Sequence, residues 1–197
     1  MIDLSKIDVE ELRKEINVAQ YKAIEIDDLK DYIEQVLQQM LNKNITRIKF
    51  SQRYKNIIDR YNAGGSENED YYEQLIQLIE ELKKENERAD AEDLTEEKLE
   101  IFDLLIAGKK LSQADEQKVK LSAKHLFEKL SDNRKDLLVV DWYKDEQPKA
   151  KVKSAIEVSL NENLPDSYDA DSFHSKIDLL MNHFIDMAVQ GYGWIAA

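Results

Sequence analysis

Cysteine is absent from this 197-residue chain, and proline and glycine are rare, with two and five residues respectively. The lack of cysteine excludes disulfide bonds and thiolate chemistry, and it suits a reducing compartment. Because proline and glycine interrupt helices, so few of them indicate long helices joined by short loops. They stand at Gly64, Gly65, Gly108, Pro148, Pro165, Gly191 and Gly193. The sequence therefore predicts an all-α fold, an irregular multi-helix bundle of about seven or eight helices.

The chain also lacks an apolar run long enough to cross a membrane, and its start does not read as a signal peptide. No serine stands in a GxSxG nucleophile elbow, and no GxxxxGK[ST] loop is present to hold ATP. The apolar segment 137–142 superficially resembles the strand that carries a magnesium-binding aspartate in ATPases, but without that loop we interpret it as a buried connector. We expect a cytoplasmic protein with no membrane partner, and no catalytic or cofactor-binding residue on this segment.

Metal-binding patterns are missing as well. A carboxylate-bridged metal pair in a helical bundle needs Glu-x-x-His on two helices, and neither His125, His174 nor His183 follows a glutamate at that spacing. Asp171 and His174 have the right spacing once, but Asp171 is also placed to cap a helix. We expect no metal site, and histidines at helix surfaces or edges.

Residues 94–108 form the segment around which the larger part of the chain is organised. Thr95 is placed as a helix N-cap, and Leu94 with Leu99 matches a hydrophobic staple across the first turn. Gly108 supplies a left-handed stop at the other end. Between these signals apolar residues occupy nearly every face, which is typical of a buried helix.

Apolar residues at three- and four-residue spacing predict the other helices. The predicted helices cover residues 5–18, 28–41, 46–61, 72–91, 95–107, 112–131, 148–160 and 171–188. We divide the chain into an N-terminal helical unit of three helices with mixed charge (1–62), a linker (63–70) and a C-terminal helical domain (71–197). The linker is assigned to NAGGSENE because this stretch is glycine-rich and polar.

The net charge of −13 is unevenly distributed. Residues 67–103 hold 15 acidic and 4 basic side chains, whereas residues 1–62 hold 11 of each. The acidic block would repel a phosphate backbone, so any contact with DNA falls to the first part of the chain. There, residues 43–60 hold six basic side chains and a single acid, Asp59.

These basic residues have two interpretations. They can grip DNA phosphates from one flank of a helix, or they can form a solvated flank that pairs with nearby acids. The candidate DNA contacts are Lys43, Lys49, Arg53, Lys55 and Arg60. Arg47 falls on the apolar side of the same helix, which favours a buried pair with a carboxylate.

Four aromatic residues are candidate anchors for a partner, because such side chains dominate interface energies. They form two neighbouring pairs, Trp142 with Tyr143 and Tyr192 with Trp194. For Trp142 the favoured alternative is packing in the core. For Trp194, in a glycine-flanked terminal segment, docking onto another domain or subunit and disorder both stay open.

In order and spacing, several segments resemble the C-terminal helical region of the restriction (R, or motor) subunit of type I restriction-modification enzymes. The similarity spans most of the chain, and helix-and-connector patterns carry it rather than a catalytic motif. The segments are IEIDDLKDYIEQVLQQMLNKNITRIKF at 24–50, RYN at 60–62, LTEEKLEIFDLL at 94–105, VVDWYKDEQPKAKVKSAIE at 139–157 and LP at 164–165.

The resemblance implies that this chain is the C-terminal portion of a longer subunit, whose nuclease and RecA-like motor domains use ATP and Mg²⁺ elsewhere. The implied partners are the methyltransferase and specificity subunits, the remaining motor and nuclease domains of the same subunit, and double-stranded DNA. The implied role is docking of the translocase and endonuclease to the methyltransferase core. The alternatives are a free-standing protein–protein adaptor and a non-specific DNA-binding helical module.

Overall fold

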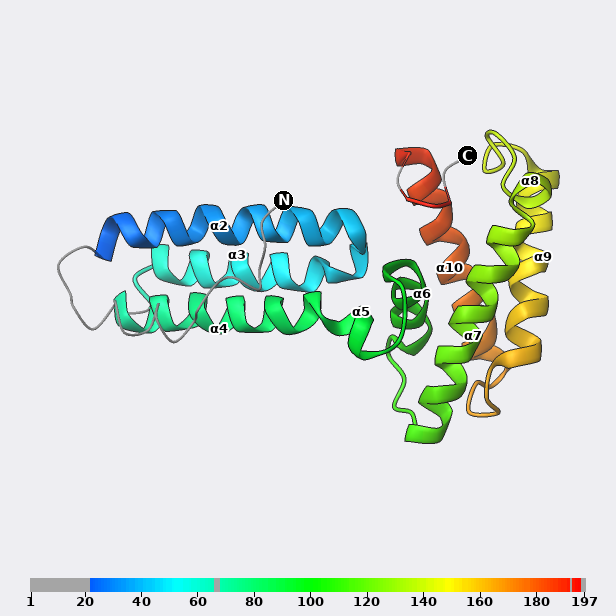
Figure 1. Ribbon diagram of the computed structural model, residues 1–197, viewed down its shortest axis with the longest axis horizontal. Coiled ribbons are helices and arrows are strands. Elements are labelled where there is room, and N and C mark those ends of the chain that lie inside the picture. The colour runs from blue at the N-terminus through cyan, green and yellow to red at the C-terminus, as the bar shows by residue number, and fades with distance from the viewer. Residues whose placement is uncertain (1–21, 66–67, 192, 196–197) are drawn as a thin grey trace. The chain divides into compact units, whose positions relative to one another are not determined.

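The computed structural model describes residues 22–65, 68–191 and 193–195, and in these residues the chain forms nine α-helices, a short 3-10 helix and no strand (Figure 1). The predicted all-α multi-helix bundle is confirmed. The helix predicted over residues 5–18 lies outside the described residues. The chain divides into two compact units, Met1–Asp93 and Leu94–Ala197.

Three long helices build the first unit. α2 (Lys22–Lys43), α3 (Ile48–Asn62) and α4 (Asn68–Asn86) lie side by side, and each runs opposite to the one before it (Figure 1). The 3-10 helix η2 (Ile45–Arg47) forms the corner between α2 and α3, and the short helix α5 (Arg88–Ala91) follows α4. Asn44 caps this corner, because its side-chain oxygen accepts a hydrogen bond from the Thr46 N–H at 3.0 Å.

A single apolar cluster forms the core of the first unit. Its members are Leu29, Ile33, Val36, Leu37, Met40, Phe50, Tyr54, Ile57, Tyr71, Tyr72, Leu75, Ile76, Leu78, Ile79 and Leu82. At the edge of this core, the Tyr54 hydroxyl donates a hydrogen bond to Glu34 at 2.9 Å. Burial, and then the contact with Glu34, raises the pKa of Tyr54 well above its usual value. The stripes on α2, α3 and α4 therefore meet as the sequence periodicity predicts.

α4 accounts for the differences from the sequence prediction in this unit. Because α4 packs against α2 and α3, the compact units divide between Asp93 and Leu94 rather than at residues 63–70. The helix predicted over 72–91 is interrupted at residue 87, between α4 and α5. Its second half would be solvated if the helix were unbroken, yet both Glu85 and Ala89 are buried.

The second unit is built around α6 (Glu96–Ile106). α7 (Gln113–Asp132) packs against α6 and α9 (Glu146–Asn163), and α10 (Ala170–Gln190) packs against the same two helices. The short helix α8 (Arg134–Leu137) leads from α7 toward α9. Four α6 residues are fully buried or nearly so: Leu99, Ile101, Phe102 and Leu105. α6 is thus a buried helix, as its all-round apolar sequence predicts.

Most helix ends in this unit follow the sequence signals. Thr95 accepts a backbone hydrogen bond at the start of α6, and Gly108 beyond its end has a φ of 72°. At the start of α10 the cap is Asp169, whose carboxylate accepts the Ser172 N–H at 2.9 Å and whose pKa these Ser172 hydrogen bonds lower. The expected cap, Asp171, lies inside the first turn, whereas the extended backbone at Asp169 lets its side chain reach back to the helix.

Two side chains fasten the C-terminal end of α6. Lys176 of α10 donates to the carbonyl oxygens of Leu104 and Ala107 at 2.8 and 2.6 Å, and the Tyr168 hydroxyl donates to the Leu105 carbonyl at 2.8 Å. Burial lowers the pKa of Lys176 and raises the pKa of Tyr168 to about 12. The last carbonyls of α6, which have no partner within that helix, therefore accept hydrogen bonds from side chains of α10 and of the loop before it.

Replacing Tyr168 with phenylalanine tests this fastening. Near neutral pH we expect Tyr168→Phe to lower the free energy of unfolding by about 1 kcal/mol, because the Leu105 carbonyl loses its donor. An unperturbed tyrosine has a pKa of 10.0, whereas burial raises the pKa of Tyr168 to about 12 in the folded chain. The stability it contributes is therefore present below pH 10 and lost as the pH rises toward 12.

The measurement is urea unfolding of both chains at pH 8 and pH 11, followed by tryptophan fluorescence. The difference between wild type and Tyr168→Phe should shrink at the higher pH, because only the wild type has this hydroxyl to ionise. The titration of Lys176 is common to both chains and cancels in the comparison. A difference that is unchanged between the two pH values would contradict the raised pKa.

Candidate interaction surfaces

A buried ion pair joins the corner of the first unit to the end of α4. Arg47 is 1 % exposed, and its Nε lies 3.3 Å from Oε1 of Glu85. The same guanidinium donates to the backbone carbonyl of Glu85 at 3.2 Å. The sequence-based expectation that Arg47 pairs with a carboxylate in a buried position is confirmed, and the pair explains why Glu85 leaves the solvent.

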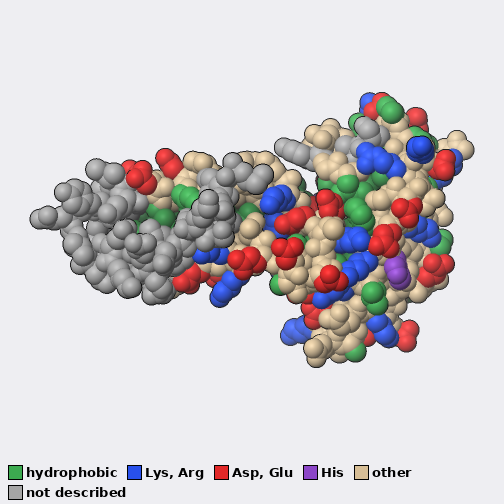
Figure 2. Space-filling view, in the orientation of Figure 1, with side chains coloured by type: hydrophobic (Ala, Val, Ile, Leu, Met, Phe, Trp, Pro, Cys, Tyr) green, Lys and Arg blue, Asp and Glu red, His purple; other side chains and the backbone are tan. Residues whose placement is uncertain are grey.

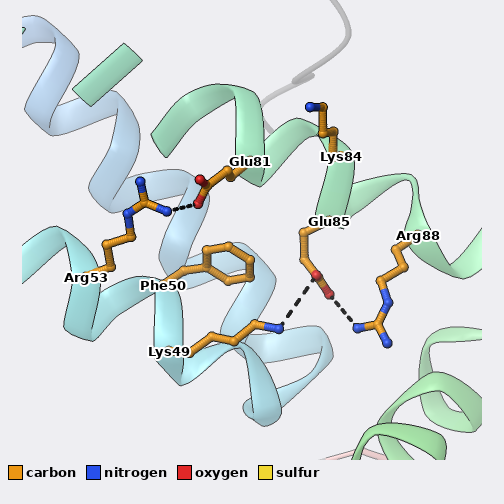
Figure 3. Close-up of a pocket in the computed structure, with 7 residues that line it drawn as sticks. All are labelled: Lys49, Phe50, Arg53, Glu81, Lys84, Glu85 and Arg88. Carbon is orange, nitrogen blue, oxygen red and sulfur yellow. Dashed lines mark hydrogen bonds and ion pairs between the residues drawn. The ribbon is translucent and has the colours of Figure 1, made fainter. Parts of the chain in front are cut away.

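A groove of about 510 Å³ lies between α3 and the end of α4. It is lined by Lys49, Phe50, Arg53, Glu81, Lys84, Glu85 and Arg88 (Figure 3). The Phe50 ring lies between two sets of charges (Figure 3). Four cationic side chains face two carboxylates, so the lining has an excess of positive charge within a chain of net charge −13.

Ion pairs occupy both sides of the groove. On one side Arg53 of α3 pairs with Glu81 of α4, and both side chains are partly exposed. On the other side the Glu85 carboxylate lies 3.9 Å from Lys49 Nζ and 3.3 Å from Arg88 Nη1. These pairs connect α3 and α5 to α4 across the groove (Figure 3).

The five predicted DNA contacts have different surroundings in the structure. Lys49 and Arg53 line the groove and pair with acids of α4, as the alternative interpretation expects. Arg60 donates to the backbone carbonyl of Gly65 at 3.3 Å. Lys43 lies in the last turn of α2, and Lys55 is exposed on α3.

Sequence reasoning missed the two cations that complete the groove. Lys84 and Arg88 belong to the acidic block of residues 67–103, where composition gave no reason to select them. Only the packing of α4 against α3 brings them to Lys49 and Arg53. No local sequence signal identifies this arrangement.

Trp142 lies in the core of the second unit. Its side chain is fully buried, and its indole Nε1 donates to the carbonyl of Ile195 at 3.3 Å. Tyr143 packs edge-on against it, with ring centroids 6.2 Å apart. The structure therefore places Trp142 in the core, which was the favoured alternative. In this position its side chain does not present a surface to a partner.

Trp194 is ordered and packs on its own unit, and docking of this residue onto another domain or subunit stays a prediction. Its ring lies edge-on to Phe127 and Phe184, with centroid separations of 4.8 and 5.5 Å. Its carbonyl accepts a hydrogen bond from Arg134 at 2.5 Å. The neighbouring candidate, Tyr192, lies outside the described residues. Glycine spacing alone could not reveal this packing, because one ring partner, Phe127, is distant in sequence and the other, Phe184, lies on α10.

Two valines are exposed on a turn that begins two residues after α8. Val140 is 81 % exposed and Val139 is 37 % exposed; we call this pair the Val139–Val140 tip. A backbone hydrogen bond closes the turn: the main-chain N–H of Trp142 donates to the Val139 carbonyl at 2.9 Å. The Lys144 N–H donates to the carbonyl of Asp141, which has a φ of 59°. The expected buried connector at 137–142 is therefore buried at Trp142 but exposed at the valines.

Residues 1–189 match the family described as "Type I restriction enzyme HindI endonuclease subunit-like, C-terminal". The match covers nearly the whole chain. The chain belongs to this family. It is thus a C-terminal domain of a type I restriction enzyme subunit, and the resemblance drawn from residues 24–165 is confirmed.

A relative of this restriction-subunit domain comes from Methanocaldococcus jannaschii and is named "Putative type I restriction enzyme MjaIXP endonuclease subunit". It is 29 % identical over 142 residues, which is 68 % of this chain. The matched part is 13 % of the relative, so the chain spans far less than the length of that subunit. No solved structure matches this chain.

The histidines of the restriction-subunit domain have structural neighbours. His125 lies 2.7 Å from the side-chain oxygen of Asn163, and His183 lies 3.2 Å from the buried carboxylate of Glu100. Among the described residues, no group of three or more histidine, aspartate or glutamate side chains is placed to hold a metal ion. No helix in the described ranges is long and apolar enough to span a bilayer.

Proposed function

We propose that this domain is a non-catalytic docking element. It would join an ATP-dependent DNA translocase and endonuclease to its methyltransferase core, in a cytoplasmic complex that also holds the specificity subunit. ATP and Mg²⁺ would act on the motor domains of the full subunit and not on this segment. The observation that carries the proposal is the family match over residues 1–189, because a subunit of a type I enzyme works in a complex with other subunits.

The use of polar groups within the domain supports this proposal. Two of the buried charge arrangements serve packing: Arg47 pairs with Glu85, and Lys176 donates to the end of α6. Neither arrangement leaves a base beside a nucleophile, as covalent catalysis requires. A domain whose charges stabilise its own helices is suited to present a surface of fixed shape.

The Val139–Val140 tip is the docking contact that we propose on this surface. Val140 is almost fully exposed, and the turn beneath it is braced by the buried Trp142. A rigid apolar contact loses little conformational entropy on binding, so more of the gain from apolar burial remains as affinity. The tip also begins the segment 139–157, one of those that resemble the restriction subunit.

Val140→Asp should weaken binding to the purified methyltransferase core at least about tenfold, because a charge would be buried in an apolar contact. Size-exclusion chromatography of the mixed components measures this as loss of co-elution. The matched control is Val189→Asp on α10, where the native valine is 61 % exposed. Both variants should unfold within about 0.5 kcal/mol of wild type. Equal binding by wild type and Val140→Asp would exclude the tip as the contact.

A DNA contact is a second function that one observation favours. The groove beside Lys49 and Arg53 has excess positive charge although the chain as a whole is strongly acidic. We propose that this region touches the phosphate backbone of double-stranded DNA near the docked motor. Such binding would be independent of sequence and would weaken steeply with salt.

A further inference from the structure

We propose that the groove between α3 and α4 binds a phosphate of the DNA backbone, and that Glu81 competes with this phosphate for Arg53. The inference rests on the DNA contact proposed above, and it names both the site and the group that limits its affinity. It adds Lys84, from the acidic block, to the cations that would meet the phosphate. It also separates the two carboxylates of the groove into one that exchanges and one that is fixed.

The cations of the groove have capacity for a further anion. Lys49 is 59 % exposed, and its distance of 3.9 Å from Glu85 exceeds that of a strong charge-assisted hydrogen bond. Lys84 is exposed, and its ammonium group points away from Glu85 (Figure 3). Neither ammonium group is therefore saturated by a close contact to Glu85, and each has capacity for a further anion.

Glu81 is the carboxylate that can be exchanged. Its pair with Arg53 is open to water, with the two side chains 39 % and 43 % exposed. Exposed ion pairs are weak, because water and salt screen both partners. The Arg53 guanidinium can therefore leave Glu81 and form paired hydrogen bonds to a phosphate, a geometry that suits arginine.

Glu85 is the carboxylate that stays in place. It is 8 % exposed, and the almost fully buried Arg47 donates to both its side chain and its backbone. Releasing it would leave the Arg47 charge buried without this partner, which costs far more than breaking a surface pair. Of the two acids, only Glu81 can therefore act as a reversible competitor.

The chemistry of the groove favours a backbone phosphate over a base. Phe50 is only 9 % exposed and lies between the ion pairs, so it offers no open ring face for stacking (Figure 3). On the face of the second unit that is visible in Figure 2, basic side chains stand among acidic ones, and the chain as a whole has a net charge of −13. A polyanion would therefore find a local cationic site on an otherwise acidic molecule.

The test uses the 197-residue chain and a fluorescently labelled duplex of random sequence, with anisotropy read at two salt concentrations. Glu81→Gln should tighten binding about two- to fivefold, because Arg53 no longer has its competitor. The matched control is Glu128→Gln in the second unit, where the native carboxylate is 51 % exposed and pairs with Lys98 at 2.8 Å. This control removes the same charge and should change affinity less.

Two further variants locate the effect. In an Arg53→Gln background, Glu81→Gln should lose most of its tightening, because there is no guanidinium left to release. Lys84→Gln should weaken binding and reduce the slope of log affinity against log salt by about one. All of these side chains are exposed or partly exposed, and circular dichroism checks that each variant is folded.

Four results would overturn the inference. If Glu81→Gln and Glu128→Gln tighten DNA binding equally, the effect comes from the overall charge of the chain. If Glu81→Gln tightens binding fully in the Arg53→Gln background, Glu81 does not compete for Arg53. Binding by wild type with no change in Lys84→Gln or Arg53→Gln would leave a DNA contact but place it outside the groove. Failure of the wild type to bind the duplex at low salt would exclude the groove and the DNA contact together, without affecting docking to the methyltransferase core.

Discussion

Glu85→Ala should lower the free energy of unfolding of the first unit by about 3–5 kcal/mol, since removing one partner of a buried ion pair is strongly destabilising. The remaining partner is Arg47, which is 1 % exposed and so cannot replace the lost carboxylate with water. Small domains are stable by only about 5–15 kcal/mol, so this loss would leave the unit marginally folded. The effect is large because Glu85 lies in the last turn of α4, where it connects that helix to the corner formed by η2.

The reciprocal variants make this prediction specific. Arg47→Met should cost less, because Glu85 keeps Lys49 and Arg88 as nearby cations. The double replacement Arg47→Met with Glu85→Leu should recover much of the loss, because apolar groups of similar volume can replace a buried pair without a desolvation penalty. A cost below about 1 kcal/mol for Glu85→Ala would show that the guanidinium finds other partners or water.

The positions of the two tryptophans allow the units to be followed separately. Both Trp142 and Trp194 lie in the second unit, and the first unit has no tryptophan. Far-UV circular dichroism reports helices of both units, whereas tryptophan fluorescence reports only the second. Glu85→Ala should therefore shift part of the dichroism transition in urea to lower concentration and leave the fluorescence transition nearly unchanged.

Trp142→Ala should destabilise the second unit by about 3–5 kcal/mol, the usual cost of truncating a buried tryptophan. The indole is fully buried, and its N–H holds the carbonyl of Ile195 at 3.3 Å. Its loss would leave a cavity and an unsatisfied Ile195 carbonyl, and it would remove the buried side chain that anchors the turn of the Val139–Val140 tip. Urea unfolding followed by the emission of Trp194 measures the change.

Val140→Asp is the matched control for this replacement, because it alters the same turn at an exposed position. Val140→Asp should leave the free energy of unfolding almost unchanged while docking is lost. Trp142→Ala should instead lower the free energy of unfolding of the second unit. A Trp142→Ala chain with wild-type stability and lost docking would place the indole in the interface. That outcome would return Trp142 to the role of partner anchor that sequence reasoning considered.

What could be predicted from the sequence was local. Thr95 as a cap, Gly108 at positive φ and the apolar stripes of α2 and α3 each depend on neighbours within a few residues. The buried role of Arg47 could also be inferred, because its helical position put it among apolar residues. Its partner Glu85 could not, because it lies in a polar stretch and is buried only through the packing of α4 on α3.

The candidate surfaces were harder to predict for the same reason. The groove combines Lys49 and Arg53 with Lys84 from another helix, and no spacing along the chain encodes that encounter. Val140 belongs to an apolar run that suggested burial throughout, but in the turn only Leu138 and Trp142 are buried, and the valines between them are exposed. The resemblance depended on the order of whole segments, which is why it identified the family without identifying the residues of an interface.

The most direct test of the docking role is competition. A type I restriction enzyme is assembled from its own subunits, including the endonuclease subunit that carries this domain. An excess of the free 197-residue chain is present during assembly, and ATP-dependent DNA cleavage is measured. Our account predicts that wild-type chain displaces the motor subunit and inhibits cleavage, that Val140→Asp chain inhibits at least about tenfold less well, and that neither chain hydrolyses ATP alone. Undiminished cleavage at saturating chain, or ATP hydrolysis or DNA cleavage by the chain itself, would contradict it.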